Sequence, residues 1–275
     1  MKNKEENILG IIGNPLKQSM SPILHNYWLK KYNLEGSYCK FQLKNIDNIK
    51  TAVRALNIKG LNITIPYKKK IIKQIDKIDK IAKTLQAVNT INNRNGILEG
   101  YNTDVEGFIL GTKKLSSINT QKPAIIIGAG GAAEAVVYGL RLIGNKKIFI
   151  MNRTKSKAQR IANKYQEVEV RKWMDYRHIN NASIIVNTTS LGMIGYPSLP
   201  ISLKNADKDT KVYDIVYNPL ETKLIKEAKK RKLENVTGLY MFLGQAQKSF
   251  KIWFNINPNL DKYLVLKIKK KIQTL

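Results

Sequence analysis

The sequence contains few cysteines, histidines and acidic side chains, and each shortage narrows the classes of possible function. One cysteine among 275 residues excludes an internal disulfide bond and fits a reducing compartment, so we expect a cytoplasmic protein. Cys39 lies in an alternating, strand-like run at residues 38–43, where we expect it to pack against neighbours. The two histidines lack the spacing of metal ligands, so we predict no metal site and assign His25 to a helix and His178 to the surface.

Long apolar runs are also missing. A membrane-spanning helix needs about 20 consecutive apolar residues, and no stretch approaches that length. The apolar run at residues 8–13 is too short and too rich in glycine for a signal sequence. With 43% hydrophobic and 25% charged residues, the composition is typical of a globular protein with one large domain or two ordinary ones, and we expect no membrane partner.

Acidic residues are outnumbered, with 20 Asp and Glu against 48 Lys and Arg, which gives a formal net charge of +28. This excess is typical of nucleic-acid binding, but it also suits electrostatic steering of a small anionic substrate and a phosphorylated cofactor. A third interpretation is a compositional bias toward Lys, Asn and Ile. The lysines are spread along every segment, and the runs at 68–70 and 267–271 are not interleaved with aromatic residues. We therefore favour bias with steering over a nucleic-acid surface.

The segment GLNITIPYK at residues 60–68 predicts a short strand that places polar groups at its end. Asn62 and Thr64 are two apart and share a face of a strand, and Pro66 cannot donate to a sheet ladder, so the strand ends there. Lys68 follows just past the strand end, where α/β proteins tend to place ligand sites. The alternative is a buried strand followed by a solvated lysine tail.

Two further segments of the first half add polar groups at expected strand ends. Ser19 and Ser21 precede a predicted helix at 23–32, whose N-terminus suits a carboxylate; the alternative is that Ser21 only caps that helix. Asp104 is the acidic side chain at these strand ends, which makes it the natural partner of Lys68.

The remaining pattern of the first half predicts mixed strands and helices. Isoleucines at 71, 72, 75, 78 and 81 recur at helical spacing and predict an amphipathic helix. The expected strands are 8–13, 38–43, 60–65, 87–93 and 97–100, and the other helices are 47–56 and 105–115.

A second unit begins after the polar linker at 116–123. The apolar strand 124–127 runs into GAGGAA at 128–133 and then into a helix that ends near Ile143. This order matches the dinucleotide-binding fingerprint G-x-G-x-x-A, in which the glycines let backbone N–H groups approach a pyrophosphate. The predicted contacts are Gly128, Ala129, Gly130, Gly131 and Ala132.

The end of the next strand, 148–151, selects between the two nicotinamide cofactors. An NAD site usually places an acidic residue here, whereas this chain has Asn152 followed by Arg153 and Lys157. A guanidinium can bind a 2′-phosphate through two hydrogen bonds, so we predict NADP(H) as the cofactor. The alternative is that both cations are ordinary surface charges.

Further elements complete the second half. The expected strands are 168–173, 183–189 and 211–217, and the expected helices are 222–231, 238–254 and a last basic helix after Pro258. The polar strand end NTTSLGM at 187–193 suits the nicotinamide half of the cofactor. Gln245 lies among apolar neighbours, so it is either a ligand contact or hydrogen-bonded to backbone.

These motifs occur together in a fixed order, and over almost its full length the chain resembles the shikimate dehydrogenase family. They are GNPLKQSMSP at 13–22, GLNITIPYK at 60–68, AVNT at 87–90, NTD at 102–104, GAGGAA at 128–133, NRT at 152–154, NTTSLGM at 187–193 and GLYMFLGQ at 238–245. The resemblance implies two α/β lobes: a substrate lobe, residues 1–104 with 239–275, and a Rossmann-type NADP-binding lobe, residues 105–238.

The resemblance also implies a function and roles for individual residues. The expected activity is the NADPH-dependent, reversible reduction of 3-dehydroshikimate to shikimate in aromatic amino acid and chorismate biosynthesis, with Lys68 and Asp104 handling the proton. Ser19 and Ser21 are expected at the substrate carboxylate. The other expected substrate contacts are Asn62, Thr64, Asn89, Asp104, Tyr217 and Gln245. The further cofactor contacts are Asn152, Arg153, Thr154, Lys157, Thr188, Thr189, Ser190, Met193, Ile215 and Gly238.

The sequence departs from the family pattern at two positions, and two alternative functions remain open. Gln18 stands where the family usually has His, and Val105 stands where Gly often follows the aspartate. One alternative is a quinate/shikimate dehydrogenase that uses NAD, and the other is a non-catalytic NADPH-binding regulator that binds nucleic acid. The sequence leaves open whether the protein is a monomer or a homodimer.

Overall fold

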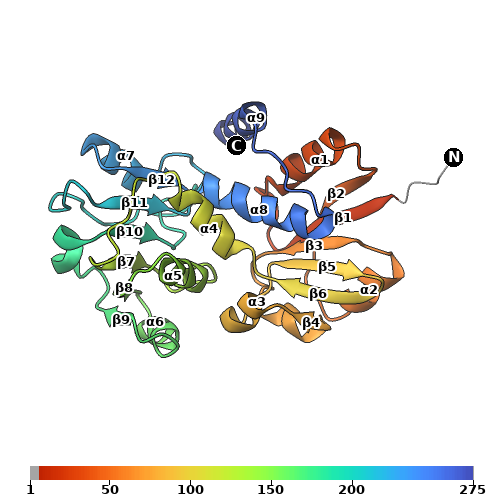
Figure 1. Cartoon of the computed structure of the whole chain (residues 1–275), viewed down its shortest axis with the longest axis horizontal. Helices are drawn as coiled ribbons and strands as arrows, with labels where there is room; N and C mark the ends of the chain where they lie inside the picture. The colour runs from red at the N-terminus through yellow and green to blue at the C-terminus, as the bar shows by residue number, and fades with distance from the viewer. Residues whose placement is uncertain (1–5, 275) are drawn as a thin grey trace. The chain divides into compact units, whose positions relative to one another are not determined.

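The computed structural model describes residues 6–274, which contain two six-stranded sheets (Figure 1). The chain divides into two units, each built around one sheet. Unit 1 runs to Thr103 and includes Gln245–Lys271, and unit 2 comprises Asp104–Gly244 with Ile272–Thr274. The prediction of two α/β lobes, with a Rossmann-type lobe in the second half, is confirmed.

The sheet of unit 1 has the strand order β2-β1-β3-β5-β6-β4. Its strands are β1 (Asn7–Gly13), β2 (Gly36–Gln42), β3 (Gly60–Ile63), β4 (Lys77–Ile78), β5 (Thr90–Arg94) and β6 (Ile97–Tyr101). β1 is parallel to β2 and β3, whereas β5 runs antiparallel to both β3 and β6. The carboxyl ends of β1, β3 and β6 therefore lie at the same edge of the sheet as the amino end of β5.

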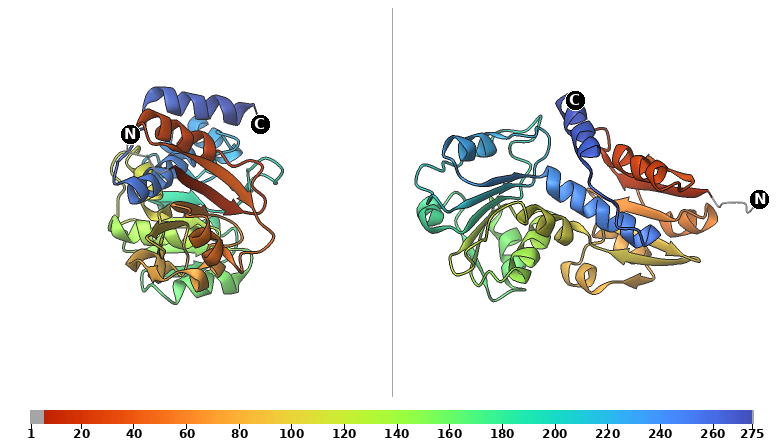
Figure 2. Two further views of the ribbon diagram at one scale, coloured as in Figure 1. Left: turned by 90° about the vertical axis from the view of Figure 1, so that its right-hand side faces the viewer. Right: turned by 45° about the horizontal axis from the view of Figure 1, so that its top comes forward.

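Helices from both ends of the chain complete unit 1. They are α1 (Ser21–Lys31), α2 (Ile49–Ala55), the 3₁₀ helix η1 (Lys70–Gln74), α3 (Lys80–Leu85), the second part of α8 (Leu239–Phe254) and most of α9 (Lys262–Gln273). Figure 2 shows α9 alongside α1, and Asp261 joins the two helices by accepting hydrogen bonds from Tyr27 Oη at 2.9 Å and Lys31 Nζ at 2.6 Å. The last helical segment thus belongs to the same unit as the first strands.

The sheet of unit 2 has the order β12-β11-β10-β7-β8-β9, and all neighbouring strands are parallel. This is the doubly wound dinucleotide-binding arrangement. Its strands are β7 (Ala124–Ile127), β8 (Ile148–Met151), β9 (Val168–Arg171), β10 (Ile184–Asn187), β11 (Lys211–Asp214) and β12 (Asn235–Thr237). Its helices are α4 (Asp104–Thr112), α5 (Ala133–Leu142), α6 (Lys155–Ala162), the 3₁₀ helix η2 (Tyr176–Asn181), α7 (Lys223–Lys230) and the first part of α8.

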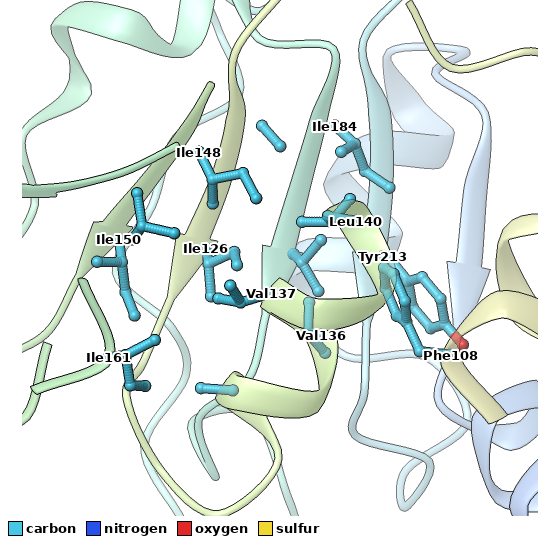
Figure 3. Close-up of a cluster of buried hydrophobic side chains, with 14 of the residues drawn as sticks. Phe108, Ile126, Val136, Val137, Leu140, Ile148, Ile150, Ile161, Ile184 and Tyr213 are labelled. Carbon is cyan, nitrogen blue, oxygen red and sulfur yellow. The ribbon is translucent and has the colours of Figure 1, made fainter. Parts of the chain in front are cut away.

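The core of unit 2 holds the cofactor-loop strand and helix in place. Ile126 of β7 packs with Val136 and Leu140 of α5 in one fully buried cluster (Figure 3). Phe108 of α4 stacks on Tyr213 of β11 in the same cluster, with ring centroids 5.1 Å apart. Burying each such side chain contributes about 1.5–3 kcal/mol, so the turn between β7 and α5 is supported by rigid elements.

Three local predictions were wrong. The isoleucines from 71 to 81 do not form one helix, because the segment splits into η1, β4 and α3, and β4 pairs with β6. Cys39 is exposed, since β2 is an edge strand on which Tyr38 takes the buried position. Met20 rather than Ser21 occupies the N-cap position of α1, which begins at Ser21.

Within residues 6–274, no helix combines the length and the apolar character needed to cross a bilayer. The same residues contain no cluster of three or more His, Cys, Asp or Glu side chains that could hold a metal ion.

Candidate functional site

The predicted substrate residues of unit 1 come from segments that end at one edge of its sheet. The loop after β1 carries Ser19, and β3 ends one residue before Thr64. Asn89 precedes β5, whose Thr90 is the register partner of Asn62 in β3. Because β5 is antiparallel to β3, its amino end meets the carboxyl end of β3, and the polar groups collect at this edge.

Asn62 is the centre of a buried polar cluster. Its Oδ1 accepts a hydrogen bond from Tyr38 Oη at 2.7 Å, and its Nδ2 donates to Thr90 Oγ1 at 3.1 Å and to Ser249 Oγ at 3.0 Å. Asn62 is only 4% exposed. Its amide therefore binds protein partners first, although a carbonyl oxygen can accept a second hydrogen bond.

Asn89 connects this cluster to the segment that leads to Asp104. Its Oδ1 accepts hydrogen bonds from the Thr103 amide at 2.8 Å and from Thr90 Oγ1 at 3.1 Å. Asn102 Nδ2 donates to the Ala87 carbonyl at 2.9 Å. The two residues before Asp104 are thus held at the sheet edge by side-chain hydrogen bonds.

Thr90, Thr103 and Ser249 were not predicted as part of the site. The hydroxyls of Thr90 and Ser249 are 2.8 Å apart, and Ser249 Oγ donates to the Gln245 carbonyl at 2.9 Å. Ser249 lies one helical turn after Gln245, which is half-buried, so that spacing was the available signal. The two threonines lie inside the AVNT and NTD motifs, where the neighbouring residues received the roles.

Lys68 follows a tightly held turn in unit 1. The Thr64 amide donates to the Ile12 carbonyl at 2.8 Å, and Tyr67 Oη donates to the Leu43 carbonyl at 2.7 Å. The Lys68 carbonyl accepts from the Val88 amide at 2.8 Å, next to Asn89. This bonding fixes the backbone from which the half-buried Lys68 side chain extends. Asp104 is the first residue of α4, is 6% exposed and belongs to unit 2, so its pairing with Lys68 stays a prediction.

The two serines flank the start of α1. The Ser21 amide approaches Ser19 Oγ at 3.4 Å, and Ser21 is 4% exposed while Ser19 is half-buried. The loop before them is pinned because the Leu16 amide donates to Gln42 Oε1 at 2.9 Å. Gln18 is exposed and lies outside this bonding.

His25 lies on α1, as predicted, and packs against the aromatic rings beside the polar cluster. Its ring stacks on Tyr38 at 4.4 Å, and neither ring nitrogen finds a hydrogen-bond partner among residues 6–274. Burial lowers the pKa of His25 to about 3, so the imidazole is neutral at physiological pH. Burial also raises the pKa of Tyr38, which a hydrogen bond with Ser21 partly offsets. His178 is half-buried and lies 4.6 Å from the Phe149 ring, rather than fully on the surface.

The glycine loop of unit 2 connects β7 to α5 and fits a dinucleotide phosphate. Gly128 has φ +111°, and a Cβ at this position would lie 2.7 Å from Thr188 Oγ1. A Cβ at Gly130 or Gly131 would lie in open space, and both glycines are exposed. The loop is therefore closely packed against the sheet at its first glycine and open to a ligand at the next two, at the N-terminus of α5.

Asn152 ties this loop to the end of β8. Its Oδ1 accepts from the Ala129 amide at 3.0 Å, and its Nδ2 donates to the Thr154 carbonyl at 2.8 Å. Arg153, Thr154 and Lys157 are exposed. The residue at the usual acidic position thus has a structural use, and the two cations beside it are accessible to a phosphate.

The predicted nicotinamide segments lie at the ends of β10 and β11 and share a buried network. Asp214 accepts hydrogen bonds from Asn187 Nδ2 at 2.9 Å, from the Val216 amide at 3.0 Å and from Thr222 Oγ1 at 2.7 Å. Asp214 and Asn187 are both fully buried. Burial raises the pKa of Asp214 to about 6, while the three hydrogen bonds oppose that rise. Asn187 opens the NTTSLGM strand end that the sequence analysis assigned to the cofactor, but neither it nor Asp214 or Thr222 was predicted as an individual contact.

The other predicted residues of unit 2 lie around this network. Thr188 Oγ1 donates to the Ile127 carbonyl at 3.0 Å, and Thr189 Oγ1 donates to Asn187 Oδ1 at 2.7 Å. The Tyr217 ring stacks on Phe242 at 5.1 Å. The Met193 amide donates a hydrogen bond to the Ser190 carbonyl at 3.1 Å. The Gly238 amide donates at 3.2 Å to the carbonyl of Val216, which is the residue after Ile215.

In a comparison with known proteins, both units match models of shikimate dehydrogenase domains. Residues 11–91 match the model of the shikimate dehydrogenase substrate binding domain, and residues 110–215 match that of shikimate / quinate 5-dehydrogenase. Shikimate dehydrogenase (NADP(+)) of Pelagibacter ubique is 40% identical over 253 residues, which cover 91% of this chain and 94% of that protein.

Two solved structures are similar along the whole chain. A shikimate dehydrogenase in complex with NADP+ has 37% identity and a TM-score of 0.87, covering 99% of this chain and 98% of that one. Quinate dehydrogenase from Corynebacterium glutamicum in complex with NAD has 27% identity and a TM-score of 0.88, covering 98% and 99%. The chain therefore belongs to the shikimate dehydrogenase family.

Proposed function

We propose that the protein catalyses the reversible, NADPH-dependent reduction of 3-dehydroshikimate to shikimate, a step toward chorismate and the aromatic amino acids. It is an oxidoreductase that uses NADP(H). The observation that carries this proposal is the match to the NADP(+)-dependent shikimate dehydrogenases over nine-tenths of the chain. Unit 1 supplies most of the substrate residues, and unit 2 supplies the cofactor residues together with Asp104 and Tyr217.

The substrate is a carboxylate with several hydroxyl groups, and the sheet edge of unit 1 offers matching partners. The hydroxyls of Ser19 and Ser21 at the start of α1 donate to the carboxylate, where the helix dipole also favours an anion. The side chains that we assign to the ring oxygens are Asn62, Thr64, Asn89, Asp104, Tyr217 and Gln245. The Asn62–Thr90–Ser249 hydrogen bonds hold the first of these in place.

Lys68 is the residue that we assign to proton transfer. NADPH, when bound, supplies the hydride to the ketone carbon. The Lys68 ammonium stabilises the negative charge that develops on the ketone oxygen and donates a proton to it; in the oxidative direction the amine accepts the proton. Asp104 is the residue that we assign to the orientation of this lysine. Positioned proton transfer of this kind contributes about 10²- to 10⁴-fold in rate.

The choice between NADP and NAD rests on residues 152–157. Arg153 and Lys157 are assigned to the 2′-phosphate, and both are exposed at the end of β8 and the start of α6. The backbone of Gly128–Ala132 is assigned to the pyrophosphate, since the loop leaves open space at Gly130 and Gly131. Thr188, Thr189, Ser190, Met193, Ile215 and Gly238 are assigned to the nicotinamide half.

The assignment of Lys68 is tested by replacing it with methionine, next to a matched control. Lys68→Met should lower kcat for shikimate oxidation by about 10²- to 10⁴-fold, because the proton acceptor is removed, while shikimate binding is retained. Lys69→Met removes the same charge from the exposed neighbour and should leave kcat unchanged. Turnover near the wild-type value in Lys68→Met would contradict the proposal.

The partners of the protein beyond its substrate stay predictions. We propose a cytoplasmic monomer or homodimer without a nucleic-acid partner, in which the +28 charge steers the anionic substrate and cofactor. Steering of this kind predicts that kcat/KM for shikimate falls as ionic strength rises, since salt screens the interaction.

A further inference from the structure

Asp214 is a buried carboxylate to which the proposed reaction assigns no role. It ends β11, is fully buried, and forms no ion pair with any residue that the structure describes. Burying a carboxylate without a cation costs stability, because water is replaced by groups that stabilise the charge less well. An apolar side chain would fill the same space without this loss of stability, so packing alone does not explain Asp214. Its three hydrogen-bond donors show which segments the carboxylate joins.

The three donors come from three different segments. Asn187 ends β10 and is the register partner of Asp214 across the sheet. Val216 follows β11, and its amide lies between the two residues assigned to cofactor and substrate, Ile215 and Tyr217. Thr222 is the N-cap residue of α7. One carboxylate thus joins the ends of two parallel strands to the start of a helix.

Asn187, which is bound to Asp214, also forms hydrogen bonds with the loop after β10. Its Nδ2 also donates to the Leu191 carbonyl at 3.0 Å, and its Oδ1 accepts from both the amide and the hydroxyl of Thr189, at 3.0 and 2.7 Å. Thr189 Oγ1 in turn accepts from the Leu191 amide at 3.0 Å. The loop is closed on itself. Its side-chain link to β11 is the hydrogen bond between Asn187 and Asp214, beside backbone hydrogen bonds from the Ile215 amide to the Asn187 carbonyl at 3.1 Å and from the Ile194 amide to the Asn218 carbonyl at 3.2 Å.

We propose that Asp214 is a positioning residue that sets the geometry of the two nicotinamide segments, residues 188–193 and 215–217, relative to each other. This inference rests on the proposed function of those segments. Asp214 is buried next to both segments and holds them by accepting hydrogen bonds from the Asn187 side chain and the Val216 amide. The glycine loop and Arg153 hold the phosphate groups independently, so loss of Asp214 affects the orientation of the reacting ring more than the binding of the cofactor.

The test separates turnover from cofactor affinity in the full-length protein. Asp214→Ala should lower kcat for shikimate oxidation by about tenfold or more and change the Kd of NADPH, measured by its fluorescence, by less than about threefold, since the phosphate contacts remain. Asp214→Asn keeps the shape and one acceptor oxygen, and should restore most of kcat. Tyr213→Phe is the matched control: it removes a buried hydroxyl of the same strand that has no partner among residues 6–274, and should change neither constant.

Each outcome decides the inference. An unchanged kcat in folded Asp214→Ala would overturn it, and so would an NADPH Kd that rises as much as kcat falls, since that would indicate a general loss of the cofactor site. If Asp214→Ala does not fold, Asn187→Ala cuts the same link and should show the same split between kcat and Kd; the absence of that split would overturn the inference. A wild-type protein that binds NADPH but does not oxidise shikimate would instead contradict the proposed function.

Discussion

Replacement by alanine should lower the stability of the protein at one glycine of the cofactor loop and its affinity for NADPH at another. Gly128 has φ +111°, a conformation that an alanine rarely adopts, and its new Cβ would lie 2.7 Å from Thr188 Oγ1 and 2.8 Å from Thr189 Cγ2. The backbone cost is about 1–3 kcal/mol, and overpacking adds about 1–3 kcal/mol. We expect Gly128→Ala to lower the free energy of unfolding by about 2–6 kcal/mol, a large part of the usual total.

Gly130→Ala should instead weaken the binding of NADPH without changing the stability of the protein. A Cβ at Gly130 would lie in open space, so the unfolding free energy should change by less than about 0.5 kcal/mol. That open space is where backbone N–H groups are expected to approach the pyrophosphate, and a methyl group there should raise the Kd of NADPH at least about tenfold.

Urea unfolding and NADPH fluorescence titration measure the two quantities on the same samples. Gly96→Ala is the control for backbone strain alone, because Gly96 has φ +84° with open space around its Cβ, in the turn between β5 and β6. It should lower the unfolding free energy by about 1–2 kcal/mol and leave the Kd unchanged. Unchanged stability in Gly128→Ala, or an unchanged Kd in Gly130→Ala, would refute the assignment of this loop.

Two further predictions concern the charge at the end of β8 and the buried carboxylate. Arg153→Ala should reduce the ratio of kcat/KM for NADPH over NADH at least about tenfold, since a charge-assisted hydrogen bond is lost only from NADPH; a wild-type enzyme that uses both equally would contradict this. Asp214→Asn should lose part of the pH dependence of stability. The pKa of Asp214 is raised to about 6 in the folded protein, above its ordinary value of 3.8, so its favourable contribution is complete below pH 4 and is lost as pH rises to 6. The unfolding free energy of wild type minus that of the variant should fall by about 3 kcal/mol between pH 3 and pH 7 in urea titrations, whereas a constant difference would contradict the raised pKa.

The sequence was most informative where one segment determines its own structure. The bounds of β7 and β8 agree with prediction to the residue, because a fully apolar run between polar or glycine-rich segments is typical of a parallel strand buried on both faces. The glycine loop could be recognised for the same reason, since its strand, turn and helix are continuous in sequence. The strand end before Pro66 was also predicted from local pattern, although β3 ends at Ile63 rather than at Ile65.

Features that depend on contacts between distant segments could not be predicted. The isoleucines at 71–81 fit a helix in isolation, but Lys77 and Ile78 pair with Glu99 and Gly100 of β6 as part of the sheet. Asn62 and Ser249 are 187 residues apart, and their hydrogen bond exists only because α8 belongs to the same unit as β3. The network around Asp214 likewise joins strands through their register, which spacing along the chain does not reveal.

The proposed activity is tested by measuring NADP+ and NAD+ reduction with shikimate and with quinate side by side. We expect kcat/KM to be highest for shikimate with NADP+, lower when NAD+ replaces NADP+, and lower when quinate replaces shikimate. Higher activity with quinate and NAD+ would instead favour the quinate-oxidising alternative. No reduction of either cofactor with shikimate, in a sample that binds NADPH, would contradict the proposed shikimate dehydrogenase activity.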